Sequence, residues 1–295
     1  MKKESFPVSA EKFKVALQYC FPQHGLSRLV GWLAASNNRF ISQTFINTFA
    51  SSFGITLEEA ERGEFTAYKS FNDFFTRTLK AEARPLDLDP KSFVSPVDGA
   101  VSQQGDVESG TIVQAKGHNY SVATLLGGDP LLAEPFEGGK FTTIYLSPRD
   151  YHRIHMPVTG TLTKMTYVPG KLFSVNPATT RHVPGLFARN ERLVCHFDTA
   201  FGEMVMVLVG ATIVAAIETV WAGQVTPPTG KNTFTWHYKG DKAITLDKGQ
   251  EMGLFKLGST VIMLMPKNAV AFDENYQAES VVRMGARIGS LTENA

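Results

Sequence analysis

Short β-rich runs separated by turn residues fill most of the chain after residue 92, and they constrain its fold more than any other feature. They are GAVSQQG (99–105), GTIVQAKG (110–117), KFTTIYL (140–146), GTLTKMTYV (160–168), RLVCHF (192–197) and STVIMLM (259–265). β-Branched and aromatic residues bounded by Gly, Pro and Asp are typical of short strands joined by tight turns. We therefore expect residues 81–295 to form a mainly β domain of sandwich-hybrid or barrel type.

The longest apolar stretch, MVMVLVGATIVAAI, covers residues 204–217. A membrane-spanning helix needs about 20 apolar residues, so this stretch is too short to span a bilayer. Its β-branched residues and the interruption at Gly210 favour buried sheet over buried helix.

The part of the chain that precedes the charged, proline-containing connector KAEARPLDLDPKS (80–92) shows helical periodicity instead of the β pattern. Apolar residues recur at spacing four, as at Ile41, Phe45 and Phe49. The first 50 residues carry six Lys and Arg against two Glu. A basic amphipathic region suits an anionic bilayer surface, although helices packed on the protein's own core show the same pattern. We expect an α+β protein in which residues 1–80 form a helical membrane-docking region.

Overall charge and cysteine content narrow the functional classes. The net charge of +1 and the lack of a basic run argue against a nucleic-acid partner. Cys20 and Cys195 are too few for a disulfide framework and fit a reducing compartment. Charged residues interrupt the N-terminal segment where a secretion signal needs an apolar run. We therefore expect a cytoplasm-facing protein.

The segment YLSPRDYHRIHMPVTG (145–160) concentrates titratable side chains. Ser147, Pro148 and Asp150 predict a one-turn helix, with His152 at its end and His155 at the start of the next strand. The two imidazoles could then point into one cavity. A spacing of three does not share one strand face and no cysteine or third histidine stands nearby, so we expect no metal site.

Two further segments complete a possible nucleophilic set. Asp98 stands in SPVDGAV, where Asp-Gly also suits an ordinary turn. Ser259 follows Gly258 in the sequence LGST. A serine hydroxyl is a poor nucleophile until a base takes its proton and an acid orients that base. The alternative for both histidines is that they are partly buried packing residues.

Eight motifs, in one consistent order, carry a resemblance to a known family. They are FNDFFTR (71–77), SPVDGAV (95–101), KGHNYS (116–121), YLSPRDYHRIHMPV (145–158), YVPGKLFSVNP (167–177), LFARNERLV (186–194), VGATIVAAIETVWAG (209–223) and KGQEMGLFKLGSTV (248–261). On these motifs the chain resembles the bacterial phosphatidylserine decarboxylase proenzymes from about residue 65 to residue 265. The first 50 residues, residues 224–248 and the tail after Pro266 diverge.

The resemblance implies that the chain cuts itself between Gly258 and Ser259. Residues 1–258 become the β chain and residues 259–295 the α chain. Ser259 attacks the carbonyl of Gly258, and elimination and hydrolysis then leave a pyruvoyl group at the new N-terminus. By the same resemblance, His155 is the base for Ser259 and Asp98 orients it. Glycine at position 258 leaves the attacked carbonyl accessible and tolerates a distorted backbone.

The second implied reaction is the decarboxylation of phosphatidylserine to phosphatidylethanolamine and CO₂. The pyruvoyl group forms a Schiff base with the substrate amine and accepts the electrons left at Cα. His152 is the residue that the resemblance assigns to reprotonation of Cα. Tyr145 is an expected substrate contact, and Arg149 and Arg153 are either headgroup contacts or surface charges.

A lipid substrate stays in its bilayer, so the enzyme must come to the membrane. The resemblance therefore favours peripheral docking of the N-terminal helices on the cytoplasmic face of the cell membrane. It also implies a homo-oligomer.

Two other functional classes use similar sequence features. A serine hydrolase could employ Ser259, His155 and Asp98 on an external ester, although the Gly-x-Ser-x-Gly elbow is absent. A lipoyl or biotinyl carrier module needs a lysine at a hairpin tip, whereas the nearest lysine after the last apolar run is Lys267, beyond Pro266. Only the decarboxylase requires two chains.

Overall fold

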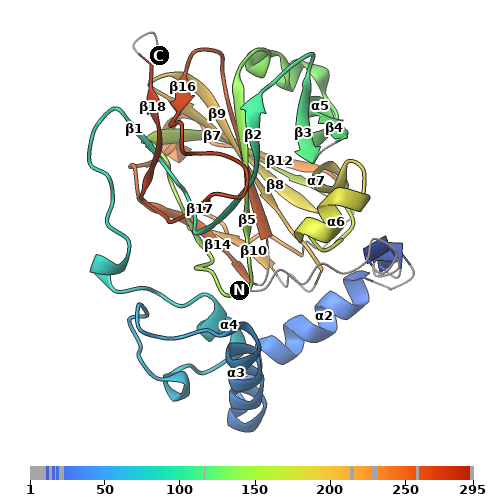
Figure 1. Cartoon of the computed structure of the whole chain (residues 1–295), viewed down its shortest axis with the longest axis vertical. Helices are drawn as coiled ribbons and strands as arrows, with labels where there is room; N and C mark the ends of the chain where they lie inside the picture. The colour runs from blue at the N-terminus through green and yellow to red at the C-terminus, as the bar shows by residue number, and fades with distance from the viewer. Residues whose placement is uncertain are drawn as a thin grey trace.

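The N-terminal helices gather at one end of the molecule, and β-sheets with a few short helices form the rest (Figure 1). This computed structural model describes residues 11–292 apart from 13, 14, 17, 20–22, 116, 213–215, 228–231 and 257–258. The expected α+β class with N-terminal helices is confirmed.

The N-terminal helices build a small apolar core of their own. They are α2 (Gln23–Ala34), α3 (Arg39–Phe53) and α4 (Phe71–Phe75). The Asn38 side chain accepts hydrogen bonds from the first amides of α3, and Gly54 ends the helix at φ +62°. The buried line of α3 runs through Ile46 and Ala50. The predicted stripe is thus shifted by one position, because Phe45 and Phe49 flank the buried line.

A large antiparallel sheet forms the centre of the β domain. Its strands in spatial order are β12 (Phe234–His237), β7 (Gly160–Val168), β8 (Arg192–Thr199), β9 (Gly202–Val209), β15 (Ser259–Met265), β5 (Lys140–Leu146), β2 (Gly99–Asp106) and β17 (Val281–Val282), with β13 (Ile244–Leu246) paired to β7. In the part of the chain that is described, this path is open rather than closed into a barrel. All the runs predicted as strands contain one.

Three smaller sheets flank the central one. The first contains, in spatial order, β11 (Gly223–Gln224), β10 (Ala216–Thr219), β14 (Glu251–Lys256) and β6 (Arg153–His155). The second contains β1 (Ser92–Val94), β18 (Arg287–Leu291) and β16 (Val270–Phe272). The third pairs β3 (Thr111–Ala115) with β4 (His118–Ser121). Short helices complete the domain: α5 (Val122–Leu125), α6 (Pro177–His182), α7 (Leu186–Arg189) and 3₁₀ turns at Phe65–Ala67, Ala81–Ala83, Pro130–Leu132, Glu134–Phe136 and Gly240–Lys242.

Both faces of the central sheet are buried, because apolar layers cover each side. Val261 and Met263 of β15 belong to one core together with Ile154 of β6 and Phe255 of β14. Ile262 of β15 belongs to the other core, which α5 and α7 cover. Alternate residues of a strand point to opposite faces, so β15 is apolar on both.

The apolar stretch at 204–217 supplies strands to two different sheets. β9 ends at Val209, and β10 begins at Ala216 in the four-stranded sheet. Between them, the carbonyl of Gly210 accepts a hydrogen bond from Asn190 Nδ2 at 2.8 Å. The predicted buried sheet is confirmed, and none of the helices among the described residues is long and apolar enough to cross a bilayer.

Candidate active site

Ser259 and Asp98 lie at the same end of the central sheet. β5 pairs with β15 on one side and with β2 on the other, so that Tyr145 lies opposite both Thr260 and Ala100. Ser259 is the first residue of β15 and Asp98 directly precedes β2. Because neighbouring strands are about 4.8 Å apart, two strand spacings, roughly 10 Å, separate the backbones at this end.

Ser259 is completely buried, and its Oγ has no hydrogen-bond partner among the residues that the structure describes. The alternation along β15 places its side chain on the face of Val261 and Met263, the face that also contacts β6 and β14. Buried hydroxyls normally have a partner, so an orphaned one indicates strain or chemistry. Leu257 and Gly258, the other half of the predicted cut site, lie outside the described residues.

The histidine segment forms a turn and a short strand. The Ser147 amide donates to Asp150 Oδ2 at 2.7 Å, and the Asp150 amide donates to the Ser147 carbonyl at 2.9 Å. The predicted helical turn is therefore wrong, since these bonds close a tight turn that does not continue as a helix. His155 is the last residue of β6 rather than the start of a strand.

His152 sits in a dry, aromatic environment. Its side chain is fully buried, with the ring centre 4.1 Å from that of Phe75. Nδ1 lies 2.8 Å from the Asp150 carbonyl oxygen, which can only accept, so Nδ1 carries the proton. Nε2 is then a lone-pair acceptor, and no described residue donates a hydrogen bond to it. Burial lowers the pKa of His152 to about 3, which keeps the ring neutral at physiological pH.

His155 sits among polar groups instead. Its Nδ1 lies 2.8 Å from the Gly249 carbonyl oxygen, so Nδ1 again carries the proton. Its Nε2 lies 3.1 Å from the Tyr151 hydroxyl, which therefore donates to it. Burial lowers the pKa of His155, opposed by the Gly249 bond and by the charge of Glu251. Among the described residues the two rings share no hydrogen-bond partner, and the cavity predicted between them stays a prediction.

Asp98 is held by arginine and by the C-terminal part of the chain. Arg84 donates from Nε to Oδ1 at 2.8 Å and from Nη2 to Oδ2 at 2.5 Å. The Met284 amide donates to Oδ1 at 2.9 Å. Arg84 also binds Glu59, which in turn binds Arg283. Arg84 lies in the charged segment 80–92, whose pattern predicts only a connector, so no sequence signal marks it as a partner of Asp98.

Two members of the predicted triad, Asp98 and His155, lie in neighbouring parts of the chain without a hydrogen bond between their side chains. The His155 amide donates to the Pro96 carbonyl at 2.8 Å, two residues before Asp98. The charge of Asp98 acts on the pKa of His155 as a small raising influence. Within the described ranges, however, Asp98, His155 and Ser259 make no hydrogen bonds to one another.

Tyr145 lies on the other face of the sheet from Ser259. It is opposite Thr260, and its ring packs against the core that includes Ile262. Burial raises the pKa of its hydroxyl to about 12. Its expected substrate contact stays a prediction.

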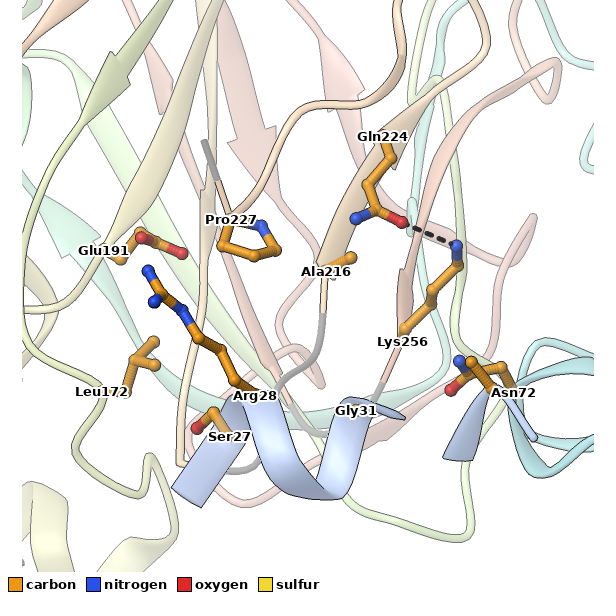
Figure 2. Close-up of a pocket in the computed structure, with 11 residues that line it drawn as sticks. Ser27, Arg28, Gly31, Asn72, Leu172, Glu191, Ala216, Gln224, Pro227 and Lys256 are labelled. Atoms are coloured by element: carbon orange, nitrogen blue, oxygen red, sulfur yellow. Dashed lines mark hydrogen bonds between the residues drawn. The ribbon is translucent and has the colours of Figure 1, made fainter. Parts of the chain in front are cut away.

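A cavity of about 260 Å³ lies between α2 and the β domain (Figure 2). Arg28 and Gly31 of α2 line it below, and Asn72 of α4 and Lys256 line one side. Lys256 ends β14, three residues before Ser259, and donates to Glu218 at 2.6 Å and to Gln224 at 3.1 Å. The cavity therefore lies next to the segment that contains the predicted cut site. Across the described part of the chain, no three His, Cys, Asp or Glu side chains gather as a metal site.

Comparison with known proteins agrees with the motif order. The sequence model of the family described as phosphatidylserine decarboxylase matches residues 71–290, and a second model, described as PSD, matches residues 13–54. The chain is 61% identical over 286 residues to a phosphatidylserine decarboxylase proenzyme of Shewanella baltica strain OS155, covering 96% of this chain and 98% of that protein. It is 60% identical over 288 residues to the proenzyme of Shewanella sp. strain ANA-3, covering 97% and 99%.

Proposed function

The chain belongs to the phosphatidylserine decarboxylase family, and on that premise we propose that it is a self-cutting precursor that decarboxylates phosphatidylserine to phosphatidylethanolamine and CO₂. The observation that best supports this function is the buried Ser259 Oγ without a partner, at the start of β15 and directly after the proposed scissile peptide. A fully buried hydroxyl supports attack on the neighbouring backbone better than attack on an external ester.

The cut exchanges an amide for an ester and then eliminates the ester. Ser259 Oγ bonds to the carbonyl carbon of Gly258, the C–N bond breaks, and the hydroxyl proton passes to the released nitrogen. Loss of the Cα proton then expels the Gly258 carboxylate, and water replaces the nitrogen, which leaves as ammonia. The product is a pyruvoyl group on residues 259–295. The buried, unpaired Ser259 fits such a group, because its Oγ has no structural bond to lose.

We assign the base of the cut to His155, oriented by Asp98. The neutral ring has its proton on Nδ1, so Nε2 can accept the serine proton once Tyr151 releases it. The Asp98 carboxylate, fixed by Arg84, lies close enough to stabilise the imidazolium that results.

We assign the protonation of the substrate Cα to His152. The pyruvoyl group supplies an electron-withdrawing carbonyl that stabilises the carbanion left when CO₂ departs. His152 cannot store a proton at rest, because its pKa is about 3. Its free Nε2 must therefore first take up a proton, for example from the substrate ammonium group, and then deliver it to Cα.

The exposed side of α2 and the start of α3 supply a membrane-docking surface in this proposal. Its large apolar side chains are Leu29, Trp32 and Phe40, with exposed fractions of 56%, 70% and 83%. Arg28 and Arg39 add positive charge beside them. Such a surface binds anionic bilayers peripherally. Because α2 also lines the 260 Å³ cavity, docking would place that cavity at the lipid surface.

Docking can be tested with Trp32→Ser combined with Phe40→Ser. We expect the double variant to sediment less with vesicles containing phosphatidylglycerol, most clearly at high salt where charge attraction is screened. Val281→Ser, a change at an exposed valine of β17, is the matched control. Equal sedimentation of the double variant and the wild type would contradict the docking surface.

The function itself is tested by intact mass and CO₂ release. We expect purified protein to contain two chains, residues 1–258 and residues 259–295, and to release CO₂ from phosphatidylserine in detergent micelles. Ser259→Ala should remain one chain and release none. An uncut wild-type protein that hydrolyses esters would instead support a serine hydrolase.

A further inference from the structure

Beside His152 lies the buried Arg77, which forms no ion pair with the described residues, although the charges of Asp98 and Asp150 act on it from farther away. Arg77, two residues after the end of α4, is only 6% exposed. Its Nη2 donates to the Arg149 carbonyl at 3.0 Å, whereas its Nη1 is buried and has no partner in the described part of the chain. Among the residues that the structure describes, no carboxylate lies within ion-pair distance of this guanidinium.

Two other buried arginines show how this fold normally satisfies such a group. Arg84 binds the carboxylates of Asp98 and Glu59. Arg192 donates to four backbone carbonyls, at distances of 2.7–2.9 Å. Arg77 has neither arrangement. A buried charge left unpaired is strongly unfavourable, and a guanidinium does not lose its proton in proteins. An anion supplied from outside would satisfy it.

Two hydrogen bonds join Arg77 and its neighbour Thr76 to the two sides of the histidine segment. It binds the Arg149 carbonyl before His152, while Arg153 Nε donates to the Thr76 carbonyl at 3.0 Å after it. The ring of Phe75, two residues before Arg77, covers His152. The Arg77 charge also acts on His152, lowering its pKa further after the larger effect of burial. An anion at Arg77 would therefore lie beside the histidine that handles the substrate proton.

We propose that Arg77 binds the phosphodiester of the phospholipid substrate and so positions the serine Cα at His152 Nε2. This inference rests on the proposed decarboxylase function. Only a methylene and an oxygen separate that Cα from the phosphorus. Arg77 can therefore hold the phosphodiester while the Cα lies at His152. The neighbouring Arg153 is a weaker candidate, because Glu251 already neutralises it through two bonds of 2.9 Å.

The phosphodiester fits Arg77 better than the substrate carboxylate does. The carboxylate loses its negative charge as CO₂ forms, so a cation bound to it would stabilise the ground state more than the transition state and slow the reaction. The phosphodiester keeps its charge throughout. Binding it contributes equally before and during the reaction, which lowers KM without opposing the chemical step.

The test measures KM and kcat for phosphatidylserine in micelles with Arg77→Gln and Arg77→Lys. We expect Arg77→Gln to be cut normally on a denaturing gel, because the cut precedes substrate binding. Its KM should rise about 10- to 100-fold, the range for loss of a hydrogen bond to a charged group, with kcat much less affected. Arg77→Lys keeps the positive charge but loses the planar guanidinium, so its KM should lie between those of the wild type and Arg77→Gln. Lys69→Gln removes an exposed charge just before α4 and should match the wild type.

Inhibition by phosphatidylethanolamine separates the two possible anions, because this product has the phosphodiester but no carboxylate. We expect Arg77→Gln to weaken its inhibition by a factor similar to the rise in KM. Unchanged inhibition with a raised KM would assign Arg77 to the carboxylate and overturn the proposal. A fall in kcat alone, or loss of the cut in both Arg77 variants, would indicate a structural role and also overturn it. If the wild type released no CO₂, the decarboxylase function itself would fail.

Discussion

His152 and His155 stand three positions apart, yet the molecule gives them opposite surroundings. His152 packs against Phe75 of the helical region, and its Nε2 has no hydrogen-bond partner among the described residues. His155 lies in a polar network in which Tyr151 occupies Nε2 and Gly249 holds Nδ1. In an extended chain, residues three apart point to opposite faces. Each face of one short segment thus meets a different part of the protein, which is what the proposed division of the two histidines between two reactions requires.

The largest effect is expected from His155→Ala. Without a base, the Ser259 hydroxyl attacks the peptide far too slowly, so the precursor should remain a single chain and release no CO₂. A denaturing gel of the purified variant measures this, and Asp98→Asn should shift the same band in the same direction. Normal cutting by His155→Ala would show that His155 is not the base for Ser259.

His152→Ala should separate the second reaction from the first. The variant is expected to be cut like the wild type, whereas kcat for CO₂ release should fall by about 10²- to 10⁴-fold, the usual contribution of general acid–base catalysis. The gel and the CO₂ assay are run on the same preparation. If this variant also remained uncut, the division of labour between the two histidines would be refuted.

The Tyr151–His155 bond predicts a smaller effect with the opposite sign. Tyr151→Phe removes the hydroxyl that occupies His155 Nε2, so the base no longer has to break that bond before it accepts the serine proton. We expect cutting of freshly translated precursor to become about 2- to 10-fold faster, the range of one neutral hydrogen bond. A slower cut would instead mean that Tyr151 orients the ring.

The smallest effect concerns stability against acid. The pKa of His152 in the folded protein, about 3, lies below the ordinary value of 6.5. The unfolded chain therefore binds more protons between these values, and stability is lost as the pH falls below about 6.5, by at most about 1.4 kcal/mol per pH unit.

Urea unfolding at pH 5 and pH 7 measures this loss, with all variants made in the uncut Ser259→Ala protein. His152→Gln should lose less stability on acidification than its parent, because it has no imidazole to protonate. His237→Gln, at an exposed position, should behave as the parent does. An equal acid response of parent and His152→Gln would show that burial does not keep His152 neutral.

Local patterns predicted the β strands well, because their period and turn residues act within a few positions. The runs at 140–146 and 259–265 are strands with those same bounds. The run at 204–217 was harder, since it enters two sheets and nothing in its composition marks the change of partner. The helical turn expected at Ser147 failed because two bonds between Ser147 and Asp150 close the chain into a tight turn.

The contacts of the candidate site residues could not be predicted from the sequence. Motif order was enough to select Ser259, His155, Asp98 and His152. It could not reveal Phe75 or Arg77, whose relation to the histidine segment depends on packing between parts of the chain more than 70 residues apart. No periodic signal links such distant positions.

The sequence by itself determined the fold class and the family, because strand pattern and ordered motifs are properties of neighbouring residues. Only the tertiary structure decided that, among the described residues, His155 Nε2 has a hydrogen-bond partner and His152 Nε2 has none, and that Arg77 keeps an unpaired Nη1. Burial and pairing depend on atoms brought together from distant segments, and these contacts set the pKa of His152 and the availability of Arg77.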